Sequence, residues 1–222
     1  MPTSRSGGTD YTRLEKLVTS QRLAPYLAVA HQDLKLAFEL YDWNVEVSAA
    51  VLEVAARVEV ILRNTLDRQM QAWGAAHGFA DWMDGAPLDR RGLQDIQEAR
   101  RRTSRYGAKA THGHRVAELN LGFWRYLCGK KYLASLWAPH LVHAFPFATG
   151  SARVIRSQVE SDAQQLLFLR NRAAHHEPIH WRDFTADLVQ VLRLVAAIDP
   201  DAHEWVKRTE RITEVVSRRP VP

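Results

Sequence analysis

The stretch "DLKLAFELYDWNVEVSAAVLEVAARVEVILRNTLDRQMQAW" (residues 33–73) decides the fold class of this chain. It contains no proline and no glycine, and its apolar residues recur at spacings of three and four, which is the period of an amphipathic α-helix. The pattern predicts a helix to about Tyr41, allows a break around residues 42–44, and then predicts a long helix that ends near Trp73.

The rest of the chain repeats this helical period between turns rich in glycine and proline. The first predicted elements after residue 73 are a loop over 74–88, a helix from an Asp89 cap to about Arg105 and a basic segment with glycines over 106–114. A helix over 114–129 and a broken, aromatic-rich helix over 130–146 follow. The last three are a long helix from Ser151 that Pro178 ends, a helix that begins near Asp183 or Thr185, and a helix with Pro200 in its first turn. No strand-like alternation longer than a few residues and no internal repeat interrupts this series. The predicted fold is therefore all-α, a single compact helical bundle with a long helix near its N-terminus.

The length and composition suit one globular domain. The chain has 222 residues, of which 46% are hydrophobic and 25% charged, enough for a core without disulfides or structural metals. The Ser/Gly-rich start predicts disorder over residues 1–9, a helical domain over 10–217 and a flexible C-terminus over 218–222.

The cysteine count and the hydropathy bear on location. Cys128 is the one cysteine in the sequence, so it has no partner for an internal disulfide, which agrees with a reducing cytosol. The first residues, "MPTSRSGGTDYT", hold no apolar signal segment, and no run of about 18 apolar residues follows. We expect a cytoplasmic protein without a membrane partner. The net charge of +5 fits a polyanionic partner such as RNA, but many soluble proteins share it.

The stretch "RNRAAHHEPIH" (residues 170–180) allows two chemistries. Its second half fits the zinc pattern H-E-x-x-H, which works when a helix places both histidines on one face. Pro178 lies inside that pattern and disfavours helix geometry there, so His176 and His180 are expected to cap a helix end instead. A loop-bound metal site of His175, His176 and His180 stays open as an alternative.

The first half of this stretch suits RNA cleavage without a metal or any other cofactor. The 2′-OH of RNA can attack the adjacent phosphate if a base such as His175 removes its proton and a cation such as Arg170 stabilises the charge. Asn171 lies four residues before His175, so on a helix it can touch and hold the imidazole. Spacing alone leaves this open, because an ordinary capped helix end with solvated charges carries the same residue types.

Three segments resemble the Abi (abortive infection) family of the HEPN ribonuclease superfamily. "LRNRAAHHEPI" (169–179) looks like the family's Arg-x4-6-His signature with a polar residue after the arginine. "LYDWNVEVSAAVLEVAARVEVILRNTL" (40–66) resembles the N-terminal Abi helix, and "VAELNLGFWRYLCGKKYLASLW" (116–137) resembles its central Gly-Phe-Trp segment. The segments stand in family order and span most of the chain.

This resemblance implies a HEPN helical core, a homodimer with the motif at its interface, and a metal-independent ribonuclease that acts in phage defence or as a toxin with an antitoxin, either a small RNA or a protein. It implies that Arg170 stabilises the scissile phosphate, that His175 is the general acid or base and that Asn171 has an orienting role. His176 and Glu177 are supporting candidates. Some HEPN toxins carry a modifiable tyrosine where this chain has Glu177, which disfavours that mode of silencing.

Two further groups are candidates for the site. Glu59, Arg63 and Asn64 share one helix, and the first two form an i,i+4 pair that could position Arg170 or contact RNA. A basic region with few acids is predicted to bind RNA phosphates, with a tyrosine that stacks on an unpaired base. Its residues are Arg101, Arg102, Arg105, Tyr106, Lys109 and Arg115.

The favoured function is an endoribonuclease that acts on single-stranded or loop RNA, with a tRNA anticodon loop as one example. The main alternative is a HEPN-fold module that binds RNA or another partner without cutting, and the loop-histidine metal hydrolase is the third.

Overall fold

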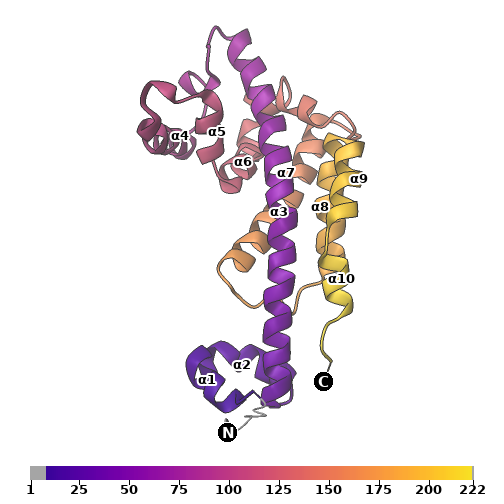
Figure 1. The fold of residues 1–222 in the computed structure, drawn as a ribbon. Coiled ribbons are helices and arrows are strands. Elements are labelled where there is room, and N and C mark those ends of the chain that lie inside the picture. The colour runs from indigo at the N-terminus through magenta and orange to yellow at the C-terminus, as the bar shows by residue number, and fades with distance from the viewer. Residues whose placement is uncertain (1–8, 222) are drawn as a thin grey trace.

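The computed structural model describes residues 9–221, and the regular structure in that range is entirely helical. Helix α3 (Leu34–Ala76) runs the length of the molecule as one continuous element of 43 residues (Figure 1). The break allowed at residues 42–44 does not occur. Trp43 and Asn44 stay helical because both are buried and bonded to distant parts of the chain, Trp43 through a 2.8 Å hydrogen bond from its Nε1 to the carbonyl of Val215.

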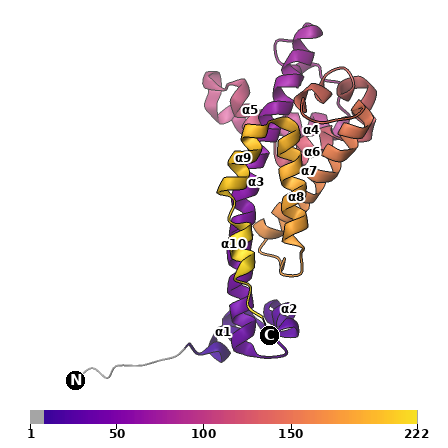
Figure 2. The ribbon, with the colours of Figure 1, turned by 90° about the vertical axis from the view of Figure 1, so that its right-hand side faces the viewer.

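The other elements gather at three places along α3 (Figures 1 and 2). The first is a hairpin at the start of α3, of α1 (Tyr11–Val18) and α2 (Ser20–Val29). The second, at the far end, contains η1 (Trp82–Asp84), α4 (Arg90–Thr103), η2 (Ser104–Lys109), α5 (His112–Glu118) and α6 (Leu121–Leu127). The third lies along the flank and contains α7 (Ala152–Ala174), α8 (Phe184–Ile198), α9 (Pro200–Thr209) and α10 (Ile212–Ser217). Short 3-10 and π turns, η3 (Lys130–Tyr132), η4 (Leu133–Trp137) and η5 (Leu141–Ala144), precede α7.

The predicted helix starts are confirmed at three N-caps and at one proline. Asp89, Ser151 and Asp183 each accept a hydrogen bond from the backbone three residues on, and Pro200 is the first residue of α9. Two predicted helices are divided. The helix expected over 114–129 is split at Asn120, whose side chain caps α6, and the last helix is split between α9 and α10.

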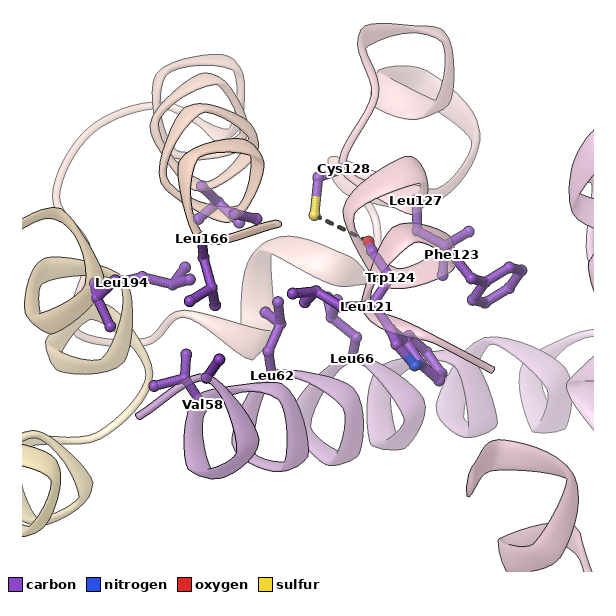
Figure 3. Close-up of a cluster of buried hydrophobic side chains, with 14 of the residues drawn as sticks. Val58, Leu62, Leu66, Leu121, Phe123, Trp124, Leu127, Cys128, Leu166 and Leu194 are labelled. Atoms are coloured by element: carbon purple, nitrogen blue, oxygen red, sulfur yellow. Dashed lines mark hydrogen bonds between the residues drawn. The ribbon is translucent and has the colours of Figure 1, made fainter. Parts of the chain in front are cut away.

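The main core lies where α3 meets α6, α7 and α8. Figure 3 shows Val58, Leu62 and Leu66 of α3 directed toward the other helices. Their partners include Leu121 and Trp124 of α6, Leu166 of α7 and Leu194 of α8. Cys128 lies in the same core, where burial raises the pKa of its thiol to about 12.

A second, smaller core joins the α1–α2 hairpin to the first turns of α3. Its buried residues include Leu23, Tyr26, Phe38 and Leu40. The all-α helical bundle is confirmed, with α3 common to both cores. The HEPN type of this bundle stays a prediction.

Two further expectations concern the ends of the chain, residues 1–9 and 218–222. Residues 1–8, within the segment predicted to be disordered, lie outside the described residues. In the segment expected to be flexible, Arg218 lies 3.5 Å from the carboxylate of Glu46 and Arg219 lies 5.4 Å from the ring centre of Trp43. Across residues 9–221, no helix combines the length and apolar character that crossing a bilayer requires.

Candidate functional site

The motif residues lie where α7 ends, beside the first half of α3. The helix ends at Ala174, before Pro178, and its last turn is closed by the backbone bonds His176 N to Ala173 O at 3.1 Å and Glu177 N to Arg172 O at 2.8 Å. This is the pattern of a Schellman cap, whose reversing residue is usually glycine. Here that residue is His176, with a φ of +56°. The left-handed residue, rather than Pro178 alone, ends the helix.

The loop after α7 is tied back to the helix and to α3. Arg172 donates to the carbonyl of Pro178 at 3.0 Å and lies 3.1 Å from the Glu177 carboxylate. The backbone amide of Ile179 donates to Asn44 Oδ1 at 2.8 Å. Glu177, predicted as a supporting residue, therefore neutralises the second arginine of the motif and helps to hold the loop in place.

Arg170 and Asn171 form a contact of their own. Arg170 Nη1 donates to Asn171 Oδ1 at 3.3 Å, and no carboxylate within residues 9–221 pairs with Arg170. The side chain of Asn171 makes no hydrogen bond to the His175 ring within the described range, contrary to the prediction. The two residues are joined only through the backbone, where the His175 amide donates to the Asn171 carbonyl at 2.9 Å. Asn171 instead orients the arginine.

His175 is exposed at the helix terminus. At 100° a residue, it lies about 140° around the helix axis from Arg170, with Asn171 between them. The guanidinium of Arg170 contacts Asn171, the residue that lies between Arg170 and His175 around the helix. The three predicted residues therefore gather at one helix end, with a cation that no acid neutralises in the described range and an accessible imidazole.

The histidines of the zinc pattern are not brought together. His176 is exposed, whereas His180 is 6% exposed with its ring 5.0 Å from that of Tyr26. Burial, and then the charge of Arg219, lower the pKa of His180. No three His, Cys, Asp or Glu side chains among residues 9–221 are grouped so that they could hold a metal ion. The loop-histidine alternative thus gains no support from the geometry.

The group on α3 lies further along that helix than the residues level with the end of α7. Glu59, Arg63 and Asn64 begin roughly 10 to 18 Å further along the helix than Leu52, which lies level with Ala173 at the end of α7. The predicted ion pair of Glu59 with Arg63 does not form within the described range. No hydrogen bond or ion pair within residues 9–221 joins this group to Arg170, so its role in positioning Arg170 stays a prediction.

The expectation of a basic region with few acids is corrected. Acidic residues from neighbouring turns neutralise most of its arginines. The pairs, at 2.6 to 3.1 Å, are Arg101 and Arg102 with Glu98, Arg105 with Glu118, and Arg115 with Asp81. The ring of Tyr106 already stacks on His114, at 4.4 Å between ring centres. Lys109 is exposed and has no ion pair within the described range. In Figure 1, α4 and α5 lie near the far end of α3, away from the C-terminal end of α7.

A cavity beside the motif is the feature that sequence reasoning missed. It lies between α2, α3 and the end of α7, has a volume of about 200 Å³, and includes Asn44, Ser48 and His176 in its lining. A buried asparagine inside an apolar helix was the available signal, because buried polar groups need partners.

No protein-family model, curated protein or solved structure matches the chain.

Proposed function

We propose that this chain is a metal-independent endoribonuclease whose reaction centre is built from Arg170, Asn171 and His175. The observation that carries the proposal is the contrast between the two arginines of the motif. Arg172 pairs with Glu177, whereas Arg170 contacts only the neutral amide of Asn171 among the described side chains. A guanidinium without an acid partner beside an exposed imidazole is suited to bind a phosphate next to a proton acceptor.

The reaction follows from these groups. His175 takes the proton of a ribose 2′-OH, and the 2′-oxygen attacks the adjacent phosphorus. The bond from phosphorus to the 5′-oxygen then breaks, and the leaving oxygen takes a proton from a protonated imidazole or from water. Arg170 stabilises the negative charge that builds on the phosphate oxygens. The products are a 2′,3′-cyclic phosphate and a 5′-hydroxyl.

A homodimer completes this scheme. The attack needs a base and the departure needs an acid, and two copies of His175 facing one groove supply both. When an Arg170→Ala chain is mixed with a His175→Ala chain, partial recovery of cleavage is expected if one intact arginine and one intact histidine suffice. A protein that stays monomeric both in solution and on RNA contradicts the shared site. A small RNA or protein antitoxin is the partner expected to restrain such an enzyme.

The first test is cleavage of a defined single-stranded RNA by purified protein in excess EDTA, with mapping of the product ends. Wild type should cut and leave cyclic or 3′-phosphate ends, and His175→Ala should lose the activity. His143→Ala is the matched control, since His143 is also exposed but lies in η5. Cleavage that needs added zinc or manganese contradicts the proposal. Binding without cleavage supports the alternative, a non-cutting RNA-binding module, which the angular separation of Arg170 from His175 favours.

A further inference from the structure

The cavity next to the motif has the size of one planar ring system. Its lining includes Arg22, Tyr41, Asn44, Ser48, Ala49 and Leu52, around a volume of about 200 Å³ that His176 also borders. A protein cavity of roughly 150 Å³ accommodates benzene, and drug-sized ligands need roughly 300 Å³ or more. Because His176 directly follows His175, the cavity lies beside the proposed catalytic histidine.

The walls combine apolar surface with two polar groups that lack partners. Asn44 is 3% exposed, and its Oδ1 accepts from the Ile179 amide at 2.8 Å. This bond fixes the orientation of the side-chain amide, so the Nδ2 group is the free end, and it donates no hydrogen bond within the described range. Ser48 is 7% exposed, and its hydroxyl has no partner among residues 9–221.

These two polar groups favour a heteroaromatic ring over an apolar side chain as the occupant of the cavity. An apolar side chain from a second copy would fill the cavity but leave the Asn44 Nδ2 group and the Ser48 hydroxyl without partners, which is costly. A heteroaromatic ring offers apolar faces to Tyr41 and Leu52 and nitrogen or oxygen acceptors at its edge. A ring of this kind therefore fits the lining better.

One lining residue of the cavity carries a positive charge. Arg22 is half-buried and has no ion pair within the described range. A ring that enters the cavity would bring an attached phosphate toward the Arg22 guanidinium. Apolar walls, polar groups for the ring edge and a guanidinium in the lining together match a nucleotide.

We propose that this cavity binds one unpaired nucleobase of the RNA substrate and so positions the neighbouring phosphate for His175. The proposal rests on the proposed function and names its substrate class. A paired base must leave its stack to enter, so duplex RNA is excluded.

The test measures binding separately from cleavage. The probe is a fluorescent 2′-O-methyl oligoribonucleotide, which lacks the attacking hydroxyl, beside an abasic oligonucleotide with the same backbone charge. Ala49→Leu fills the cavity from its wall, and Ala56→Leu, two turns further on the same exposed face of α3, is the matched control. Ala49→Leu should weaken binding of the base-bearing probe about tenfold and leave the abasic probe unchanged.

A second variant removes only a hydroxyl. Ser48→Ala should also weaken the base-bearing probe, by a smaller factor, because the apolar walls remain. Equal affinity for the two probes in wild type, no measurable binding of either, or no effect of Ala49→Leu overturns the proposal. A change in sedimenting mass for Ala49→Leu without a change in affinity assigns the cavity to a contact between copies and also overturns it. Base-dependent binding without RNA cleavage keeps the nucleobase site but rejects the nuclease and, with it, the positioning of the phosphate for His175. Cleavage without base-dependent binding keeps the nuclease and rejects the nucleobase site.

Discussion

His176→Gly should stabilise the protein, because the backbone at this position suits glycine and not histidine. A residue with a side chain in the left-handed region is destabilised by roughly 1–2 kcal/mol, and glycine is not. The φ of His176 is +56° and the side chain is exposed, so its removal loses little packing. Glycine also increases the entropy of the unfolded chain, which offsets about 0.4–1 kcal/mol.

The net gain should be about 0.5–1 kcal/mol, which raises the melting temperature by roughly 1–4 °C in a chain of this size. Thermal and urea unfolding measure it, and His31→Gly is the matched control. His31 is also an exposed histidine with a positive φ, of +49°, but it lies between α2 and α3. The two variants should gain similar stability, and only His176→Gly should weaken binding of the base-bearing probe. A loss of stability at His176 beside a gain at His31 would falsify the strain argument.

Three further outcomes follow from the same contacts. Arg172→Ala should lower the free energy of unfolding by about 1–3 kcal/mol, because it removes the hydrogen bond to Pro178 and the ion pair with Glu177. In the same urea titration, Arg153→Ala, at an exposed position, should change this free energy by less than about 0.5 kcal/mol. The pKa of His180 is lowered in the folded state, so this residue contributes stability above its unfolded pKa of about 6.5, and the contribution is lost as the pH falls below that value. Between about pH 7.5 and 5.5 the urea midpoint should therefore drop less in His180→Gln than in wild type. An equal drop would contradict the assignment. Leu62→Ala removes a side chain with no exposed surface from the main core and should cost about 2–5 kcal/mol by chemical unfolding, and a cost below about 1 kcal/mol would place Leu62 outside that core.

The helices could be predicted from local patterns because their signals are local. The caps Asp89, Ser151 and Asp183 are polar residues that precede an apolar helical period, and each was identifiable without tertiary information. The break allowed at residues 42–44 was wrong for the opposite reason. Trp43 and Asn44 are held by partners more than a hundred residues away, which no local window contains.

Some ion pairs of the predicted basic region could be read from the sequence, and others could not. Glu98 lies three and four residues before Arg101 and Arg102, so this neutralisation was visible in the helical spacing. The pairing of Arg115 with Asp81 joins two separate turns and depends on the packed fold. Composition therefore overestimated the charge that the basic region presents to a polyanion.

The end of α7 shows why the candidate site is more than its motif. Spacing placed Asn171 beside His175, but the side-chain amide contacts Arg170, and the turn at His176 brings that residue to the rim of a cavity that α2 and α3 supply. A strained backbone residue is retained where the surrounding structure fixes it, and such residues cluster at functional sites. If glycine at position 176 gives a more stable chain that binds the base-bearing probe less well, the strain and the proposed binding site are two aspects of one residue. If stability and affinity rise together, the left-handed turn serves only to end the helix.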